Sequence, residues 1–266
     1  MDKAKLFEKY RKEEDRLLIS KLLDKVSLVD KTNKIQNTDF LSPIELQVLK
    51  DVLQILQINN YTIFGGTENA QRNMIIIYPQ KLENVFETGA FDYNSICSCI
   101  RIVNDQEKYD HKVFLGGLIK LGIKREKIGD IIVFDNGADI IISKELTKFL
   151  TSNLSELTRF QKCKIELIDL KEITIKEQEY KSIKIIVSSL RLDNIISELA
   201  KTSRNKSNEI LKQERVFINY KNEIKPTKMI KNGDIVTIRG VGKFIIDDVD
   251  GHTRNERVIV EARKYM

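Results

Sequence analysis

Tryptophan is absent from the chain, and proline and cysteine are rare. Only 3 prolines occur among 266 residues, which argues against rigid proline-rich linkers. The three cysteines, Cys97, Cys99 and Cys163, form no disulfide framework, and an odd number is typical of a reducing cytosol. Cys97 and Cys99 share a strand face, but nothing nearby completes the four ligands of a structural zinc site. We therefore expect buried thiols and no metal.

Long apolar runs are also missing. No stretch approaches the ~20 residues that a membrane helix needs, and the first 18 residues are too polar for a signal peptide. The sequence therefore predicts a cytoplasmic protein without membrane contact. It is also expected to be a monomer.

Catalytic and nucleotide-binding signals are weak. His111 and His252 are the only histidines, and neither has an evident partner for acid–base work. Gly65-Gly66, Gly116-Gly117 and residues 240–243 fit no phosphate-binding loop. We expect no cofactor and no enzymatic activity.

The charge is unevenly distributed along the chain. Residues 181–266 hold 18 basic and 11 acidic residues, a net charge of +7, whereas the other 180 residues carry −1. Such asymmetry points to an anionic partner for the last third. The alternative is a solvated lysine-rich surface.

Three domains are predicted, 1–80, 81–180 and 181–266, in an α+β fold. Residues 5–30 have helical periodicity, and Ser42 or Thr38 opens a second helix whose first position is Pro43. Two short strands around a Gly-Gly turn, a small hairpin, complete this N-terminal helical domain.

The middle segment has the order β-α-β-β-α-β, which is typical of ferredoxin-like folds. Asp110 and Ser143 are the expected helix N-caps, and Asn136-Gly137 the expected hairpin turn. Its candidate sheet residues are aliphatic or Cys rather than a Phe/Tyr pair that stacks bases. RNA binding and a scaffold or protein-contact role both stay open for this domain.

The last third begins with two helices, about 190–201 and 204–213, the second capped by Ser203. Asp193 is expected to face away from the core, and a final hairpin to turn at Asp250-Gly251. The second helix starts with Arg204 and Lys206, although a helix N-terminus already favours anions. We interpret this cluster as a phosphate site, with Ser203 capping the helix and able to donate to a phosphate. The alternative is solvated side chains that cover apolar surface.

The predicted RNA-binding set extends from these helices into the strands that follow. It comprises Arg191, Lys201, Ser203, Arg204, Lys206, Ser207, Lys212, Arg215, Asn219, Lys221, Arg239 and Lys243.

This segment resembles the S-four RNA-binding domain, named for the fourth protein of the small ribosomal subunit. The matching positions are Arg191-Leu192-Asp193, Ser203-Arg204, Val216, Ile218-Asn219, Gly233-Asp234-Ile235 and Arg239. Glu214 and Tyr220 stand where the pattern has Gly, so the local turns are expected to differ.

Together with FGGTENAQRN and HKVFLGGLIKLGIKREKIGDIIV upstream, the arrangement is similar to the bacterial YlmH family over nearly the whole chain. The resemblance implies a non-catalytic protein that binds ribosomal RNA or tRNA on the large ribosomal subunit. In related proteins the role is the handling of stalled subunits that carry peptidyl-tRNA. Two alternatives stay open: an RNA-modifying enzyme of the pseudouridine synthase or methyltransferase type, and an adaptor for acidic proteins.

Overall fold

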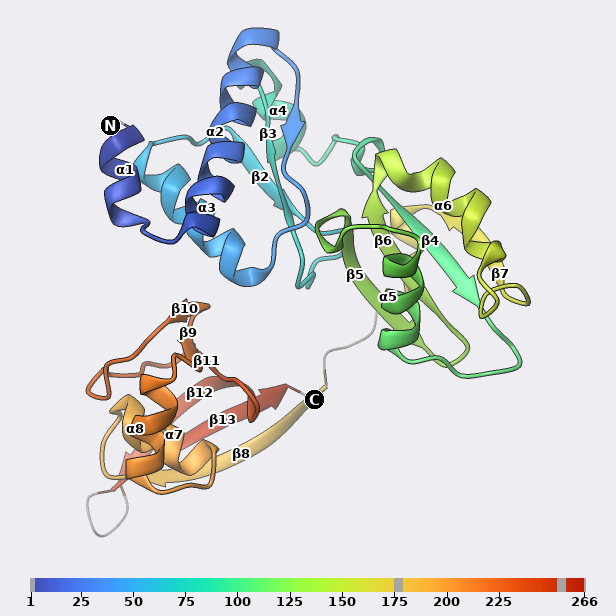
Figure 1. The fold of residues 1–266 in the computed structure, drawn as a ribbon. Coiled ribbons are helices and arrows are strands. Elements are labelled where there is room, and N and C mark those ends of the chain that lie inside the picture. Colours follow the sequence, from blue (N-terminus) through green and yellow to red (C-terminus); the bar gives the residue numbers. More distant parts are fainter. Residues whose placement is uncertain (1–2, 175–178, 253–256, 266) are drawn as a thin grey trace. The chain divides into compact units, whose positions relative to one another are not determined.

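The structure is a computed structural model, and it describes residues 3–174, 179–252 and 257–265. The chain is a mixed α/β protein with several antiparallel sheets, and it divides into two compact units, Met1–Lys176 and Glu177–Met266 (Figure 1). Within the described ranges, no helix combines the length and the apolar character that crossing a membrane requires.

The first unit opens with helices and a small sheet. The stretch predicted as one helix is two, α1 (Lys3–Lys9) and α2 (Glu13–Thr32), and α3 (Pro43–Ile55) follows. Ser42 caps α3 in a reciprocal capping box with Glu45, so the predicted start is confirmed. The predicted strands are β2 (Tyr61–Phe64) and β3 (Met74–Ile77), and β1 (Gln36–Asn37) pairs with β3. Two residues are too short for a periodic signal, so β1 was not predicted.

The second part of this unit follows the predicted order of elements. After α4 (Glu83–Glu87) come β4 (Cys97–Val103), α5 (His111–Lys120), β5 (Ile128–Phe134), β6 (Gly137–Ser143), α6 (Thr147–Asn153) and β7 (Lys164–Ile168). The strands form one antiparallel sheet in the order β5-β6-β4-β7. Asp110 caps α5 by accepting from the N–H of Val113. Ser143 makes no side-chain cap, because a 3-10 turn precedes α6, so that part of the prediction is wrong.

The two parts of the first unit share a core. Phe40 and Met74 pack in one buried cluster with Cys97, Cys99 and Ile141 from β4 and β6. This cluster covers the sheet on the face opposite α5 and α6, because the alternate β4 residues Ile100 and Ile102 pack with those helices. The domain boundary predicted near residue 80 stays a prediction, because this shared packing does not test it.

The second unit places two helices on one face of a single sheet. Its elements are β8 (Tyr180–Val187), α7 (Leu192–Leu199), α8 (Arg204–Lys212), β9 (Val216–Ile218), β10 (Lys221–Asn222), β11 (Ile235–Ile238), β12 (Gly242–His252) and β13 (Val258–Tyr265). The sheet order is β10-β9-β11-β12-β13-β8. The predicted apolar stripe of α7 is buried against it. The turn predicted at Asp250-Gly251 is wrong, because β12 continues to His252.

Candidate nucleic-acid interface

The turn between α7 and α8 is built by backbone hydrogen bonds. Thr202 N–H donates to the carbonyl of Ser197 at 2.8 Å, and Lys201 has a left-handed φ of 49°. This is the Schellman geometry that ends many helices. It leads the chain directly into Ser203, whose hydroxyl accepts from the N–H of Lys206 at 3.3 Å. The predicted cap at Ser203 is confirmed, and the start of α8 is fixed beside that of α7.

Asp193 joins the two helix starts. Its carboxylate accepts from Arg191 at 3.1 and 3.2 Å and from Arg204 Nε at 3.0 Å. The prediction that Asp193 faces the solvent is wrong, because the residue is only 2% exposed. Helical periodicity gave the wrong face here because two arginines supply the partners that a buried carboxylate needs.

The electrostatics of this triad favour the ionised carboxylate. Burial by itself would raise the pKa of Asp193, but the hydrogen bonds and charges of Arg191 and Arg204 outweigh it, and the pKa lies below its ordinary value. Two guanidinium groups thus share one carboxylate. Their side chains are 37% and 52% exposed, so N–H donors and a net positive charge stay at the surface.

Three exposed lysines lie in the turn and on α8: Lys201 in the turn, Lys206 in the first turn of α8 and Lys212 in its last turn. Lys206 lies where backbone N–H groups and the helix dipole already attract anions. We group the two arginines of the triad and these three lysines as one candidate phosphate-binding set, which we call the helix-start surface. It comprises Arg191, Lys201, Arg204, Lys206 and Lys212.

Ser207, which the sequence predicted to bind RNA, is buried and does not face the surface. It is 0% exposed, and its hydroxyl donates to the carbonyl of Ser203 at 3.2 Å. In a helix, residues four apart lie on the same face, so Ser207 lies behind Ser203 and supports the cap from the inside.

The turn at Asn219-Tyr220, where the S-four pattern has Asn-Gly, has a left-handed backbone although Tyr220 is not glycine. Asn219 and Tyr220 have φ of 47° and 65° and connect β9 to β10 as a two-residue hairpin. Glu214 likewise has φ of 55°. The side-chain amide of Asn219 is used within the fold: it donates to the Asp234 carboxylate at 2.8 Å and accepts from the N–H of Ile235 at 2.9 Å. It shapes the loop rather than offering a free amide.

Lys243 lies in an aromatic cluster that the sequence did not indicate. Its amino group is 2.8 Å from the hydroxyl of Tyr220 and 4.2 Å from the ring centroid of Tyr265. Tyr265 packs edge-on against Tyr180, and Arg263 lies over the Tyr180 ring at 4.8 Å. Burial, together with the neighbouring tyrosines, raises the pKa of Tyr265 to about 12. Register could have revealed the cluster, because Tyr265 is directly opposite Tyr180.

The remaining predicted residues surround β9, β10 and β11. Arg215 donates to the carbonyl of Arg239 at 2.5 Å, and the Arg239 guanidinium lies 4.6 Å from the ring centroid of Phe217. Lys221 is exposed on β10. Arg215 is thus partly used to hold the strand ends together.

The predicted residues therefore divide between two surfaces. Phe244 and Ile246 on β12 belong to the core beneath α7 and α8. Alternation along the strand then places Lys243 on the opposite face of the sheet. The structure joins Arg191 and Arg204 through Asp193 and places Lys243 on the other face of the sheet. The RNA-binding role of these residues stays a prediction.

The thiols of the first unit are buried. Burial raises the pKa of Cys97 to about 12 and raises that of Cys99 as well, so both are protonated and unreactive at neutral pH. Among the residues that the structure describes, no three His, Cys, Asp or Glu side chains gather as a metal site.

Three comparisons show which known proteins the chain is similar to. A family model described as "Putative RNA-binding domain in YlmH" matches residues 91–176. The chain is 29% identical over 264 residues to "Ribosome-associated protein quality control protein P2" of Bacillus subtilis (strain 168), covering 97% of this chain and 99% of that protein. A solved structure, "Cell division protein ylmH from Streptococcus pneumoniae", is similar with a TM-score of 0.47 and 20% identity, covering 61% of this chain and 96% of the other.

Proposed function

We propose that this chain belongs to the YlmH family and that it binds structured RNA, ribosomal RNA or tRNA, on the large ribosomal subunit. The observation that carries the proposal is the Arg191–Asp193–Arg204 triad. A buried carboxylate holds two half-exposed guanidinium groups in fixed positions. Arginine in a fixed orientation suits phosphate, because its donors match phosphate oxygens in pairs.

The fold assignments are part of the same proposal. We assign the second unit to the S-four domain and residues 81–180 to a ferredoxin-like domain, preceded by a helical domain at 1–80. The sheet order β5-β6-β4-β7 and the order of elements support the second assignment. The paired helix starts and the left-handed turns at Glu214 and Asn219-Tyr220 support the first.

The cellular role follows from the relative in Bacillus subtilis, whose name refers to ribosome-associated protein quality control. We propose that this chain acts in the cytosol as a monomer on large subunits that still carry peptidyl-tRNA. Phosphate contacts position a protein without reading sequence. Its specificity then comes from RNA shape and from simultaneous contact by both units.

We further propose that binding is the whole activity and that no bond is made or broken. The test is to incubate the protein with large subunits and common group donors, then digest the RNA and analyse its nucleosides by mass spectrometry. Unchanged nucleosides are expected. A new modification would favour the alternative, an RNA-modifying enzyme that docks through its S-four domain.

The central test uses charge reversal on α8. Arg204→Glu is unsuitable alone, because it would place a second carboxylate against buried Asp193. Lys206→Glu with Lys212→Glu avoids this, since both side chains are exposed. We expect this variant to lose cosedimentation with large subunits and to bind RNA at least about tenfold more weakly, because two phosphate contacts become repulsive.

The matched control reverses the same amount of charge elsewhere, in Lys31→Glu with Lys34→Glu, both exposed at the end of α2. This control is expected to cosediment normally, and both variants to show the circular dichroism and melting of the wild type. Normal cosedimentation of the Lys206/Lys212 variant would refute the helix-start surface. Equal loss in the control would instead mean a nonspecific effect of net charge.

A further inference from the structure

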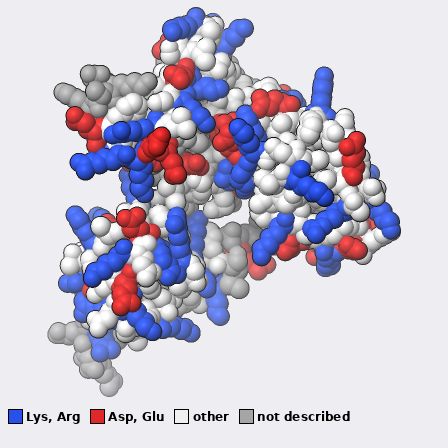
Figure 2. Space-filling model, in the orientation of Figure 1, with Lys and Arg blue, Asp and Glu red and all other residues white. Residues whose placement is uncertain are grey.

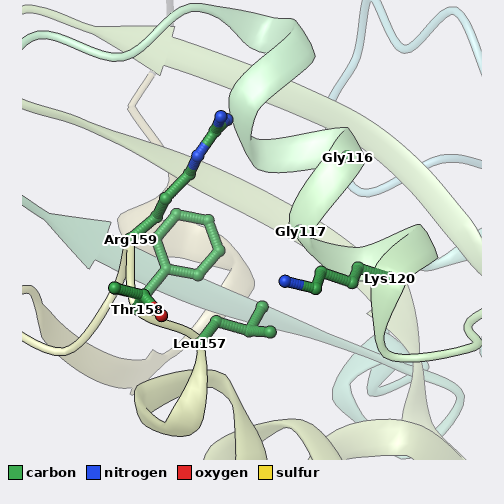
Figure 3. A pocket seen from close by; sticks show the side chains of 7 residues that line it. Gly116, Gly117, Lys120, Leu157, Thr158 and Arg159 are labelled. Carbon is green, nitrogen blue, oxygen red and sulfur yellow. The ribbon is translucent and has the colours of Figure 1, made fainter.

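A cavity of about 450 Å³ lies in the first unit, and none of its lining residues belongs to the helix-start surface. One wall is the middle and end of α5, at Gly116, Gly117 and Lys120, and the opposite wall is the segment Leu157–Phe160 that follows α6. Figure 3 shows Lys120 extending its amino group into the cavity from one wall, while Arg159 runs along the other. None of these residues has a part in the function proposed above.

Close packing explains one of the two glycines of α5 but not the other. A Cβ on Gly117 would stand 2.5 Å from the ring of Phe160, so close packing requires a glycine there. A Cβ on Gly116 would meet nothing within 4 Å, and its φ is not left-handed. Glycine inside a helix is destabilising relative to alanine. Neither packing nor backbone geometry therefore accounts for Gly116, which leaves bare helix backbone along the cavity wall.

Both walls of the cavity lack acidic residues. The charged residues that line it are Lys120 and Arg159, and none of the lining residues is Asp or Glu. The lining itself is mostly apolar, with cations at the rim. An apolar floor with cationic edges is complementary to a planar base that carries a phosphate.

In residues 91–176, the face of the sheet opposite α5 and α6 is covered and cannot bind an RNA base. Single-stranded bases commonly stack on the open sheet of ferredoxin-like RNA modules. Here Phe40 and Ile173 cover that sheet at Cys97, Cys99 and Ile141. RNA that binds this part of the chain must therefore use another surface, and the cavity on the helix side is a concave one.

We propose that this cavity takes one unpaired RNA nucleotide. The base lies against the bare backbone of Gly116 and the side chain of Leu157, and its phosphate contacts Lys120 and Arg159. This inference rests on the proposed function, because the helix-start surface supplies most of the affinity for paired RNA. The cavity adds a preference for RNA that has a nucleotide out of its stack.

The test uses the full chain and two fluorescein-labelled RNA hairpins, one with a single-nucleotide bulge and one fully paired, with each of the four bases tried in the bulge. The wild type is expected to bind at least one bulged hairpin about fivefold or more tightly than the paired one. Gly116→Leu fills the cavity and should remove this preference while keeping the affinity for paired RNA. Gly116→Ala should remove part of it and raise the melting temperature, because alanine favours the helix.

Ser152→Leu on α6 is the control, since it adds the same side chain at an exposed position of the same unit. It should keep the preference. A wild type without any preference for bulged RNA, or a folded Gly116→Leu variant that retains it, would overturn the inference and leave the proposed function standing. A wild type that binds neither hairpin would overturn both. Competition by an acidic peptide as strong as by the bulged RNA would assign the cavity to a protein partner instead.

Discussion

At the scale of single residues, Asp193 decides how the helix-start surface is organised. Removing its charge in Asp193→Asn leaves Arg191 and Arg204 without their shared anion. Because both guanidinium groups are partly exposed, we expect a loss of about 1–3 kcal/mol in the free energy of unfolding, below the 3–5 kcal/mol typical of fully buried pairs. RNA affinity should fall too, since the arginines lose their fixed positions.

The pH dependence of this loss has a definite sign. The folded pKa of Asp193 lies below its ordinary value of 3.8, so its stabilising contribution is fully present above that pH and declines as the pH falls through the folded pKa. Urea unfolding of wild type and Asp193→Asn at several pH values checks this. The difference between them should be constant from pH 5 to 7 and should shrink below about pH 4. A difference that grows on acidification would contradict the ion-pair account.

At the scale of the element, the backbone is strained at Glu214, the residue that follows the end of α8. The sequence indicated this position only through the Gly that the S-four pattern has there. Glu214 has φ of 55°, its N–H bonds to Leu211, and the N–H of Arg215 bonds to Ile210. This is the same Schellman geometry as at Lys201. The expectation that non-glycine residues change the turn is wrong, because two backbone hydrogen bonds per turn hold the left-handed conformation.

Replacing Glu214 by glycine should therefore stabilise the protein. A non-glycine residue in the left-handed region costs about 1–2 kcal/mol, and glycine loses part of that gain through its unfolded-state entropy. We expect Glu214→Gly to raise the free energy of unfolding by about 0.5–1 kcal/mol in urea titrations. Glu209→Gly, inside the same helix, should lower it by about 1 kcal/mol. Two changes of the same sign would mean that Glu214 is not strained.

At the scale of the whole molecule, periodicity and capping residues predicted most helices and strands. They did not predict which side chains of different elements contact one another. Ser42, Asp110 and Ser203 marked helix starts correctly because a cap is a local interaction. The contact of Asp193 with Arg204 and that of Lys243 with Tyr265 join residues that are 11 or more positions apart. Such pairs become visible only once the packing of the helices and the register of the strands are known.

The distribution of charge along the sequence differs from the distribution of basic side chains over the surface. The sequence assigns the basic excess to the last third, yet Figure 2 shows Lys and Arg side chains over both units. In the first unit they include the cavity rim at Lys120 and Arg159. Net charge along the sequence therefore does not by itself locate the surfaces that are suited to phosphate.

This gives a prediction for the dependence of binding on salt. Each neutralised phosphate contributes about −0.7 to −0.9 to the slope of log affinity against log salt concentration. The five cations of the helix-start surface should give residues 177–266, which have their own core, a slope of about −3.5 to −4.5 for the bulged hairpin. The full chain should show a slope steeper by about 1.5, because Lys120 and Arg159 add two contacts. Lys120→Gln with Arg159→Gln in the full chain should return the slope to that of the isolated unit. Identical slopes for the full chain and the isolated unit would show that the first unit makes no phosphate contact.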